Sequence, residues 1–556
     1  MNIKPLKSFF IRYFALGAFL IVAVLSRPYY YADSYEYAHT IMDQEAGKPA
    51  PLFLESSHAI WRPIGLAAHQ AFKWPISKFL DFYMDGRPSV FAEVSAALIL
   101  VVFVLTIVGI FYLYRLLRLF PLSETTVHAT ALLYVISQCI VNYSRTGTSY
   151  MAGLSVIIIG LFYTIRNHEH TKFKDFLLGG ILLAIAPLLW LPFVLALPAA
   201  IFARPLIYGW KRNTIKGSAI LICISLATSV FIFILIVAHL NIGSLAGASK
   251  WFFRPGQSGP NAGPQRTFFG LSKTLFYLGD QGLYVKRFLL HDPYNPVSAL
   301  SLIGLGIWKQ ALFYCLLAAS IVTIWRSPAT RKYLLFLFVG FIPTIALSIL
   351  WDGSALERHM PLLPFMFVGF ALMLEKGSKP VKSLFIVVSI ATVLVNLGGM
   401  WRANLREDEI KVDEKIEEMW PRLNDHSLVA ITSAHDDLGK FQWNNPFDKF
   451  NQSSRLQPYA LISMGYDSAR LWREKFESAS VSSWSKGGNV WVSRSLLALA
   501  PAKDMYWIEG SDPVSWSQIS GYFQSHRYSD STKDFLLLQP GSLVLAPPEV
   551  SVLKPE

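Results

Sequence analysis

The chain has 556 residues, of which 53% are hydrophobic and only 16% are charged, and its formal net charge is +13. A soluble protein of this length carries about a quarter charged residues, so the composition excludes an ordinary soluble domain. The basic residues lie in short segments between apolar runs, which excludes a nucleic-acid partner and indicates loops at a membrane surface.

Repeated apolar runs predict a polytopic membrane protein. About eleven spans, each near the ~20 residues that a bilayer requires, are predicted along residues 1–400. They lie at 9–26, 93–114, 124–141, 149–165, 175–188, 190–204, 217–239, 302–325, 333–350, 361–375 and 383–400. Lys and Arg precede the first span and follow spans two, four, six, eight and ten. The positive-inside rule therefore predicts an inside N-terminus and an outside C-terminus.

The fold class follows from this topology. Residues 1–400 are predicted to form an all-α transmembrane domain with outer loops at 27–92, 240–301 and 351–360. Residues 401–556 are predicted to form a soluble α/β domain on the outer side. Strand-like runs are predicted in it at 428–432, 459–463, 489–493 and 534–539.

The first outer loop opens with an acidic and aromatic cluster, Tyr31-Ala32-Asp33-Ser34-Tyr35-Glu36-Tyr37-Ala38. Helical spacing places Asp33 and Glu36 on one face with Tyr37 beside them. Carboxylates so close to hydrocarbon are costly unless they serve a function, and such a pair can accept a proton or bind a sugar hydroxyl. The alternative is an aromatic belt at the membrane interface with solvated acids.

The same loop holds a second candidate in Ser57-His58-Ala59-Ile60-Trp61-Arg62-Pro63. His58 and Arg62 fall on one helical face, which suits an anion or a sugar. The alternative is an interfacial helix whose Trp and Arg reach toward lipid headgroups.

Basic residues in the later outer loops are candidate phosphate ligands. The loop 351–360 contains Glu357, Arg358 and His359, and a guanidinium there can grip a phosphate through two hydrogen bonds. The alternative is a salt bridge of Glu357 with Arg358 in an ordinary turn. In loop 240–301, Lys286 and Arg287 stand among aromatic residues, which suits a lipid phosphate or plain anchoring at the interface.

These motifs together resemble the GT-C superfamily of polyprenyl-phosphate-sugar glycosyltransferases. The resemblance is to the protein O-mannosyltransferase and lipid A aminoarabinose transferase branch. Members carry an acidic motif in the first outer loop, as in Asp33-Ser34-Tyr35-Glu36-Tyr37-Ala38. They also carry an Arg-(Tyr/His)-x-x-Leu-Pro-like stretch in a late outer loop, as in Arg358-His359-Met360-Pro361-Leu362-Leu363-Pro364.

The resemblance implies a hexosyl- or pentosyltransferase in the bacterial inner membrane. It would take a sugar from a polyprenyl phosphate at the outer face and pass it, with inversion, to a protein, lipid or glycan. Asp33 and Glu36 would be catalytic. The substrates would be bound by Tyr37, His58, Arg62, Lys286, Arg287, Glu357, Arg358 and His359.

Cofactors and competing functions stay open. No cofactor is predicted, and a divalent metal remains an alternative, although residues 142–148, where relatives often carry a second acid, contain no carboxylate. A lipid or polysaccharide transporter is one alternative function. A membrane-anchored sensor or assembly factor that acts through residues 401–556 is another. No nucleotide-binding loop or hydrolase motif is present.

Overall fold

The computed structural model describes residues 4–29, 31, 33–84, 89–166, 172–253, 263–279, 281–289, 291–433, 438, 447, 457–462, 471–502 and 514–542. The chain divides into two compact units. A membrane unit comprises Met1–Gln281 and Leu302–Arg406, and a C-terminal unit comprises Gly282–Ser301 and Glu407–Glu556.

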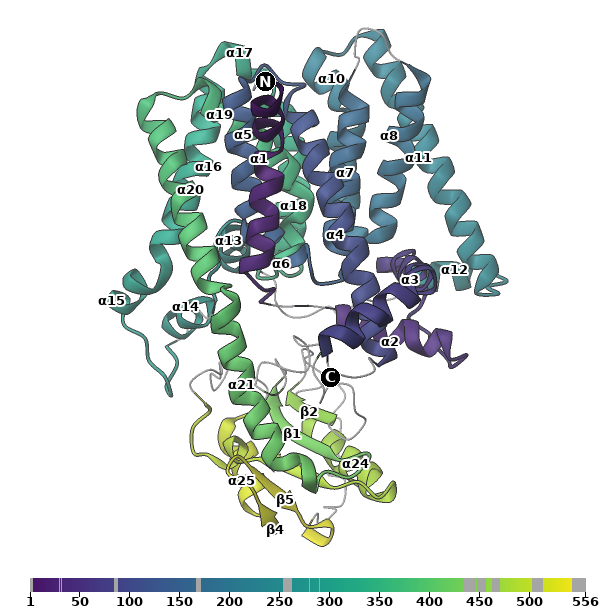
Figure 1. The fold of residues 1–556 in the computed structure, drawn as a ribbon, viewed down its shortest axis with the longest axis vertical. Helices are drawn as coiled ribbons and strands as arrows, with labels where there is room; N and C mark the ends of the chain where they lie inside the picture. The colour runs from purple at the N-terminus through teal and green to yellow at the C-terminus, as the bar shows by residue number, and fades with distance from the viewer. Residues whose placement is uncertain are drawn as a thin grey trace, which may run out of the picture. The chain divides into compact units, whose positions relative to one another are not determined.

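The membrane unit is helical throughout its described residues (Figure 1). Its first helices are α1 (Lys4–Leu25), α2 (Ser34–Glu45), α3 (Trp61–Met84), α4 (Val90–Leu117), α5 (Glu124–Ile136), α6 (Gln138–Tyr143) and α7 (Ser149–Ile165). The middle ones are α8 (Phe173–Leu189), α9 (Leu197–Ile201), α10 (Ala203–Tyr208), α11 (Arg212–His239), α12 (Leu245–Phe252), α13 (Pro264–Lys273) and α14 (Gln281–Leu289). The last ones are α15 (Ala299–Leu302), α16 (Trp308–Arg326), α17 (Pro328–Arg331), α18 (Leu334–Leu350), α19 (Leu363–Lys376) and α20 (Lys379–Gly399).

Several of these helices are suited to a bilayer. Among the described residues, the segments long and apolar enough to cross one are Val90–Leu117, Leu191–Tyr208, Arg212–His239, Trp308–Arg326 and Lys379–Gly399. Shorter apolar helices are Phe14–Leu25, Ser149–Ile165 and Leu334–Leu350. The helices therefore indicate an integral membrane protein, while about eleven spans and the sidedness of the loops stay predictions.

Two predicted spans are interrupted. The run 124–141 breaks at Ser137, whose extended backbone separates α5 from α6. The freed groups are used, because the N–H of Gln138 donates to the carbonyl of Leu275 and the Asn396 amide donates to the carbonyl of Ile136. A second break falls at Trp190, between the prolines at 187 and 192, as those prolines lead one to expect.

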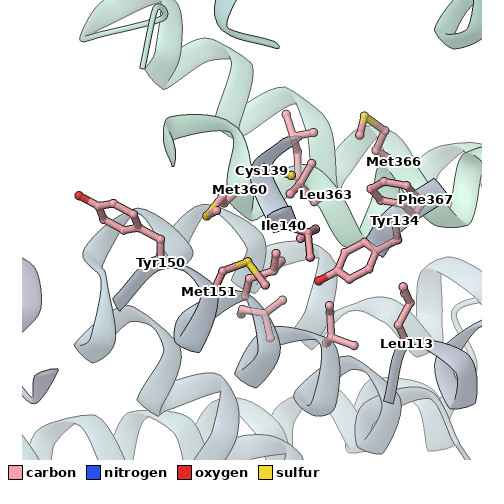
Figure 2. Packing of buried hydrophobic residues seen from close by; sticks show 14 of the residues in the cluster. Leu113, Tyr134, Cys139, Ile140, Tyr150, Met151, Met360, Leu363, Met366 and Phe367 are labelled. Atoms are coloured by element: carbon pink, nitrogen blue, oxygen red, sulfur yellow. The ribbon is translucent and has the colours of Figure 1, made fainter. Parts of the chain in front are cut away.

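A single apolar core fills the membrane unit. Figure 2 shows part of it, where side chains of α4, α5, α6, α7 and α19 meet around Ile140 and Met151. Tyr150 leaves α7 in another direction, with its hydroxyl pointing away from this cluster. The core thus holds α7 rigidly while Tyr150 is available to the outer-loop residues.

The C-terminal unit is a small α/β domain, as predicted. Its five strands have the order β2-β1-β3-β5-β4, with β1, β2 and β3 parallel and the other pairs antiparallel. Alternate residues of β1 face opposite layers, Leu428 toward one core and Val429 toward the other. The strands are β1 (Leu428–Ser433), β2 (Gln457–Ile462), β3 (Val490–Ser493), β4 (Tyr528–Ser531) and β5 (Phe535–Leu538). The helices are most of α21 (Arg402–Met419), α24 (Trp472–Ser485) and α25 (Trp516–Gln524).

The division between the units differs from the predicted boundary at residue 400. Residues 282–301, predicted as part of an outer loop of the transmembrane domain, belong to the C-terminal unit. Tyr294 packs against one of its apolar cores, and Arg287 pairs with Asp292 at 3.4 Å. A segment far from the tail in sequence therefore completes the C-terminal domain.

Candidate functional site

Asp33 stands at the start of α2, and two tyrosines hold its carboxylate. Burial of Tyr37 and Ile41 fixes one face of α2 against the bundle. Asp33 is the residue before the helix, yet its side chain makes no capping bond. Instead, Oδ2 accepts hydrogen bonds from the hydroxyl of Tyr150 and, at 3.3 Å, from that of Tyr37. The carboxylate is thus oriented by groups from α2 and α7.

His58 lies behind Tyr37. Its Nε2 is 3.0 Å from the Tyr37 hydroxyl, and its Nδ1 is 2.9 Å from Oγ of Ser149 and 3.2 Å from the carbonyl of Leu189. Burial lowers the pKa of His58 to about 4, so the ring is neutral near pH 7. Because both nitrogens are occupied, the arrangement suits a residue that positions Tyr37.

Arg62 and Glu36 form the acidic side of this cluster. Arg62 is fully buried, and it donates to Glu55 at 3.0 Å and lies 3.8 Å from Glu36. Its guanidinium also stacks on Tyr37, 4.8 Å from the ring centroid. Burial, reinforced by the charge of Asp33, raises the pKa of Glu36. The two acids predicted on one face are therefore electrostatically coupled.

The late outer loop presents Glu357 and Arg358 from a short helix, Glu357–Leu362, that precedes α19. The Glu357 carboxylate accepts a 2.8 Å hydrogen bond from Tyr143, and burial raises its pKa. The Arg358 guanidinium stacks on Trp351 at 3.8 Å and lies 5.7 Å from the ring of Trp190. Its buried Nε has no hydrogen-bond partner, and no ion pair with a described carboxylate is formed. Arg358 is therefore held by aromatic rings with its donors unused.

An aromatic wall joins the two clusters. The rings of Tyr143 and Tyr150 meet edge to face at 5.3 Å, and Tyr150 meets Trp190 at 4.8 Å. Because Tyr150 bonds Asp33 and Trp190 lies under Arg358, the structure brings the first and the last outer-loop motifs to one place. Tyr143, Tyr150 and Trp190 were not expected from the sequence, since each lies at the edge of an apolar run.

Lys273 is a further member that sequence reasoning missed. It ends α13, donates from Nζ to the carbonyl of Ser354 at 3.0 Å, and burial lowers its pKa. The charges of Glu357 and Asp352 act on it. The one available signal was its position in the basic and aromatic stretch of the second long loop.

The remaining predicted residues lie elsewhere. His359 is fully buried and lies 3.0 Å, through Nε2, from the carbonyl of Gly353, which suits support of the loop. Arg287 belongs to the C-terminal unit, where it is 3% exposed and paired with Asp292. Lys286 lies in α14, and its side chain is outside the described part of the chain. The structure therefore does not bring Lys286 and Arg287 to the Asp33 cluster.

The described residues do not fit a divalent metal ion. Among them, no three His, Cys, Asp or Glu side chains lie close enough to share one. Arg145, in the loop where relatives carry an acid, donates to the carbonyls of Ser26 and Val141 and so fastens the end of α1.

Two glycines let α13 touch the late outer loop. A Cβ at Gly270 would lie 1.8 Å from the carbonyl oxygen of Gly353 and 2.6 Å from Nε2 of His359. We expect Gly270→Ala to lower the free energy of unfolding by about 1–3 kcal/mol or more, because backbone must move. Thermal unfolding in detergent measures this. Gly398→Ala is the control, since its Cβ would meet no atom within 4 Å, and equal losses in both variants would contradict the contact.

The burial of His359 predicts a pH dependence of stability. Burial lowers its pKa to about 4, below the ordinary value of about 6.5. The stability that this neutral ring contributes is therefore complete above pH ~6.5 and is lost as the pH falls toward ~4. We expect His359→Gln to lose stability less steeply than the parent across this window, by up to about 1.4 kcal/mol per pH unit. Melting curves at each pH measure it. The exposed His239→Gln should follow the parent, and parallel curves for His359→Gln would contradict the prediction.

Comparisons with known proteins agree with this arrangement. A family model described as dolichyl-phosphate-mannose-protein mannosyltransferase matches residues 80–239. ArnT from Cupriavidus metallidurans bound to undecaprenyl phosphate is similar in structure, with a TM-score of 0.53 and 10% identity over 97% of this chain and 98% of that chain. The oligosaccharyltransferase AglB from Archaeoglobus fulgidus, in complex with an inhibitory peptide and a dolichol-phosphate, has a TM-score of 0.46 and 13% identity over 88% and 70%. No curated protein has a matching sequence. The predicted resemblance to the GT-C glycosyltransferases is confirmed by the family model and the shared fold.

Proposed function

We propose that this chain is a glycosyltransferase that moves a sugar from a polyprenyl-phosphate donor to an acceptor at the outer face of the membrane. The observation that carries the proposal is the placement of the Asp33 carboxylate and the Arg358 guanidinium on one aromatic wall, formed by Tyr143, Tyr150 and Trp190. The family model over residues 80–239 and the fold shared with ArnT support it.

In this proposal Asp33 acts as the base. The acceptor oxygen or nitrogen attacks the anomeric carbon from the face opposite the phosphate, its proton passes to Asp33, and the configuration inverts. Tyr150 and Tyr37 fix the direction of the carboxylate lone pairs, which places the base without a cost of ordering at the moment of reaction. Glu36, with its raised pKa, is the second acid of the site.

The departing group is the polyprenyl phosphate. As the bond from the anomeric carbon to the phosphate oxygen breaks, negative charge grows on the phosphate, and Arg358 can hold two of its oxygens at once. Lys273 lies close enough to Glu357 for their charges to interact, and so adds a second cation beside Arg358. The phosphate is already a stable leaving group, so the proposal needs no nucleotide, and no metal is invoked.

Tyr143, Tyr150, Trp190 and Trp351 offer flat apolar faces of the kind on which a sugar ring packs. The same surface does not distinguish a hexose from a pentose, and the acceptor is proposed only by class, as a protein, lipid or glycan. The outer face of a bacterial inner membrane remains the proposed location.

The proposal is tested with purified protein in nanodiscs and a series of polyprenyl-phosphate sugars. Release of free polyprenyl phosphate together with a glycosylated acceptor is expected, without any nucleotide sugar. The series should include hexose and pentose donors, and a truncation after Arg406 tests whether the C-terminal unit is needed. Binding of lipid-linked sugars without release from any donor, in the presence of membrane extract as acceptor, would contradict the enzyme proposal.

A further inference from the structure

Arg115 is a cation without an acidic partner at the end of the bundle that carries the N-terminus (Figure 1). It lies in the last turn of α4 and is exposed to solvent. Its guanidinium lies 5.1 Å from the ring of Phe111, 5.7 Å from that of Tyr112 and 5.4 Å from that of Phe162. Within the described residues it makes no hydrogen bond or ion pair, so rings alone hold it in place.

A second guanidinium lies across the same ring. Arg166, at the end of α7, is 5.3 Å from Phe162 and 4.3 Å from Tyr163. It bonds the buried carboxylate of Asp175, while its own buried Nε has no partner. One carboxylate therefore faces two guanidiniums, and the cluster carries a net positive charge. The hydroxyls of Tyr112 and Tyr163, 3.1 Å apart, add a donor beside it.

Capping of helix ends does not account for Arg115. Cations commonly serve the free carbonyls at helix C-termini. At the end of α7 that task belongs to Arg204, which donates to the carbonyls of Thr164 and Arg166. Arg118, after α4, pairs with Glu124. Arg115 is thus left with its hydrogen-bond donors free.

The surface of α4 below Arg115 is apolar and exposed. Leu100, Val104 and Phe111 are 39%, 49% and 41% exposed. Their spacing of four and seven residues, continued by four to Arg115, places all of them along one stripe of the helix. In a membrane such a stripe faces acyl chains, and the guanidinium at its end lies at headgroup level.

We propose that this end of α4 and α7 binds an anionic glycerophospholipid. The headgroup phosphate accepts hydrogen bonds from the forked donors of Arg115 and from a tyrosine hydroxyl, and Arg166 adds charge. One acyl chain lies along Leu100, Val104 and Phe111. The site is separate from the Asp33 cluster, which lies at the other end of α7, and does not depend on the function proposed for that cluster.

Native mass spectrometry of the full chain in detergent tests this. The probes are phosphatidylglycerol and phosphatidylcholine with identical acyl chains. The parent is expected to retain phosphatidylglycerol over phosphatidylcholine, and Arg115→Gln to weaken that retention about tenfold, the loss expected for charge-assisted bonds to phosphate. Arg115→Lys, which keeps the charge and the stem, should fall between the two.

Arg331→Gln is the matched control. Its guanidinium also stacks on a tryptophan, Trp325, but is already bonded to the carbonyl of that residue, so parent-like binding is expected. Equal retention of both lipids by the parent, or equal retention of phosphatidylglycerol by the parent, Arg115→Gln and Arg115→Lys, would overturn the proposal. Competition by inorganic phosphate at the same concentration would identify a free anion as the ligand and overturn the lipid assignment.

Discussion

Asp33→Asn is expected to lower the rate of sugar transfer ~100-fold or more, while binding of the lipid-linked donor stays near that of the parent. Asparagine keeps the size of the side chain and an oxygen that can accept from Tyr150 and Tyr37, so the local structure should survive. What is lost is the negative charge and the site for the acceptor proton. Single-turnover assays in nanodiscs, with donor binding measured separately, give the two quantities.

Asp43→Asn is the matched control for this change. Asp43 lies on the same helix and forms only an exposed pair with Lys48 at 3.9 Å, so parent-like transfer is expected. Near-normal transfer by Asp33→Asn would remove Asp33 from the role of base. Glu36→Gln would then be the next variant, because Glu36 is the acid coupled to Asp33 and its pKa is already raised.

Arg358→Ala is expected to weaken both donor binding and transfer by about a hundredfold, since charge-assisted hydrogen bonds to an ionised phosphate are each worth about 1.5–3 kcal/mol. Arg358→Lys should lose at least about tenfold, because lysine keeps the charge but cannot form the forked pair of bonds. Truncation also removes the stacking on Trp351, so thermal unfolding of each variant must be measured beside its activity.

Arg331→Ala serves as the control, because it removes a guanidinium that also stacks on a tryptophan outside the Asp33 cluster. If Arg358→Ala and Arg358→Lys both bind the polyprenyl-phosphate sugar like the parent, then Arg358 is structural. Lys273 would become the leading phosphate ligand, and Lys273→Ala would be expected to weaken donor binding in its place.

Local patterns in the sequence predicted much of the fold. The apolar runs predicted a membrane protein because hydrocarbon accepts only segments whose backbone is internally bonded. Four strand-like runs in the tail correspond to β1, β2, β3 and β5, since buried strands need apolar side chains over a short length. The strand β4 was missed because its residues, Tyr528–Ser531, are mostly exposed and polar.

The candidate site was predicted in part. Asp33 and Glu36 were found because ionised groups beside hydrocarbon are rare and carry a cost. Arg358 was found because its loop is short and charged. The proximity of Asp33 and Arg358 could not be read from the sequence, because the tyrosines that join them lie on α6 and α7, more than 100 residues from either motif.

What the sequence determined by itself is therefore local: which segments enter the membrane, which acids share a helical face, and where strands occur. Tertiary structure alone decided three other matters. Backbone contact at Gly270 brings Lys273 to the loop of Arg358, and packing buries His58 and His359. Residues 282–301 join the C-terminal unit. Each depends on contacts between distant segments, and such contacts leave no periodic trace in the chain, because an apolar or basic residue reads alike whichever partner it meets.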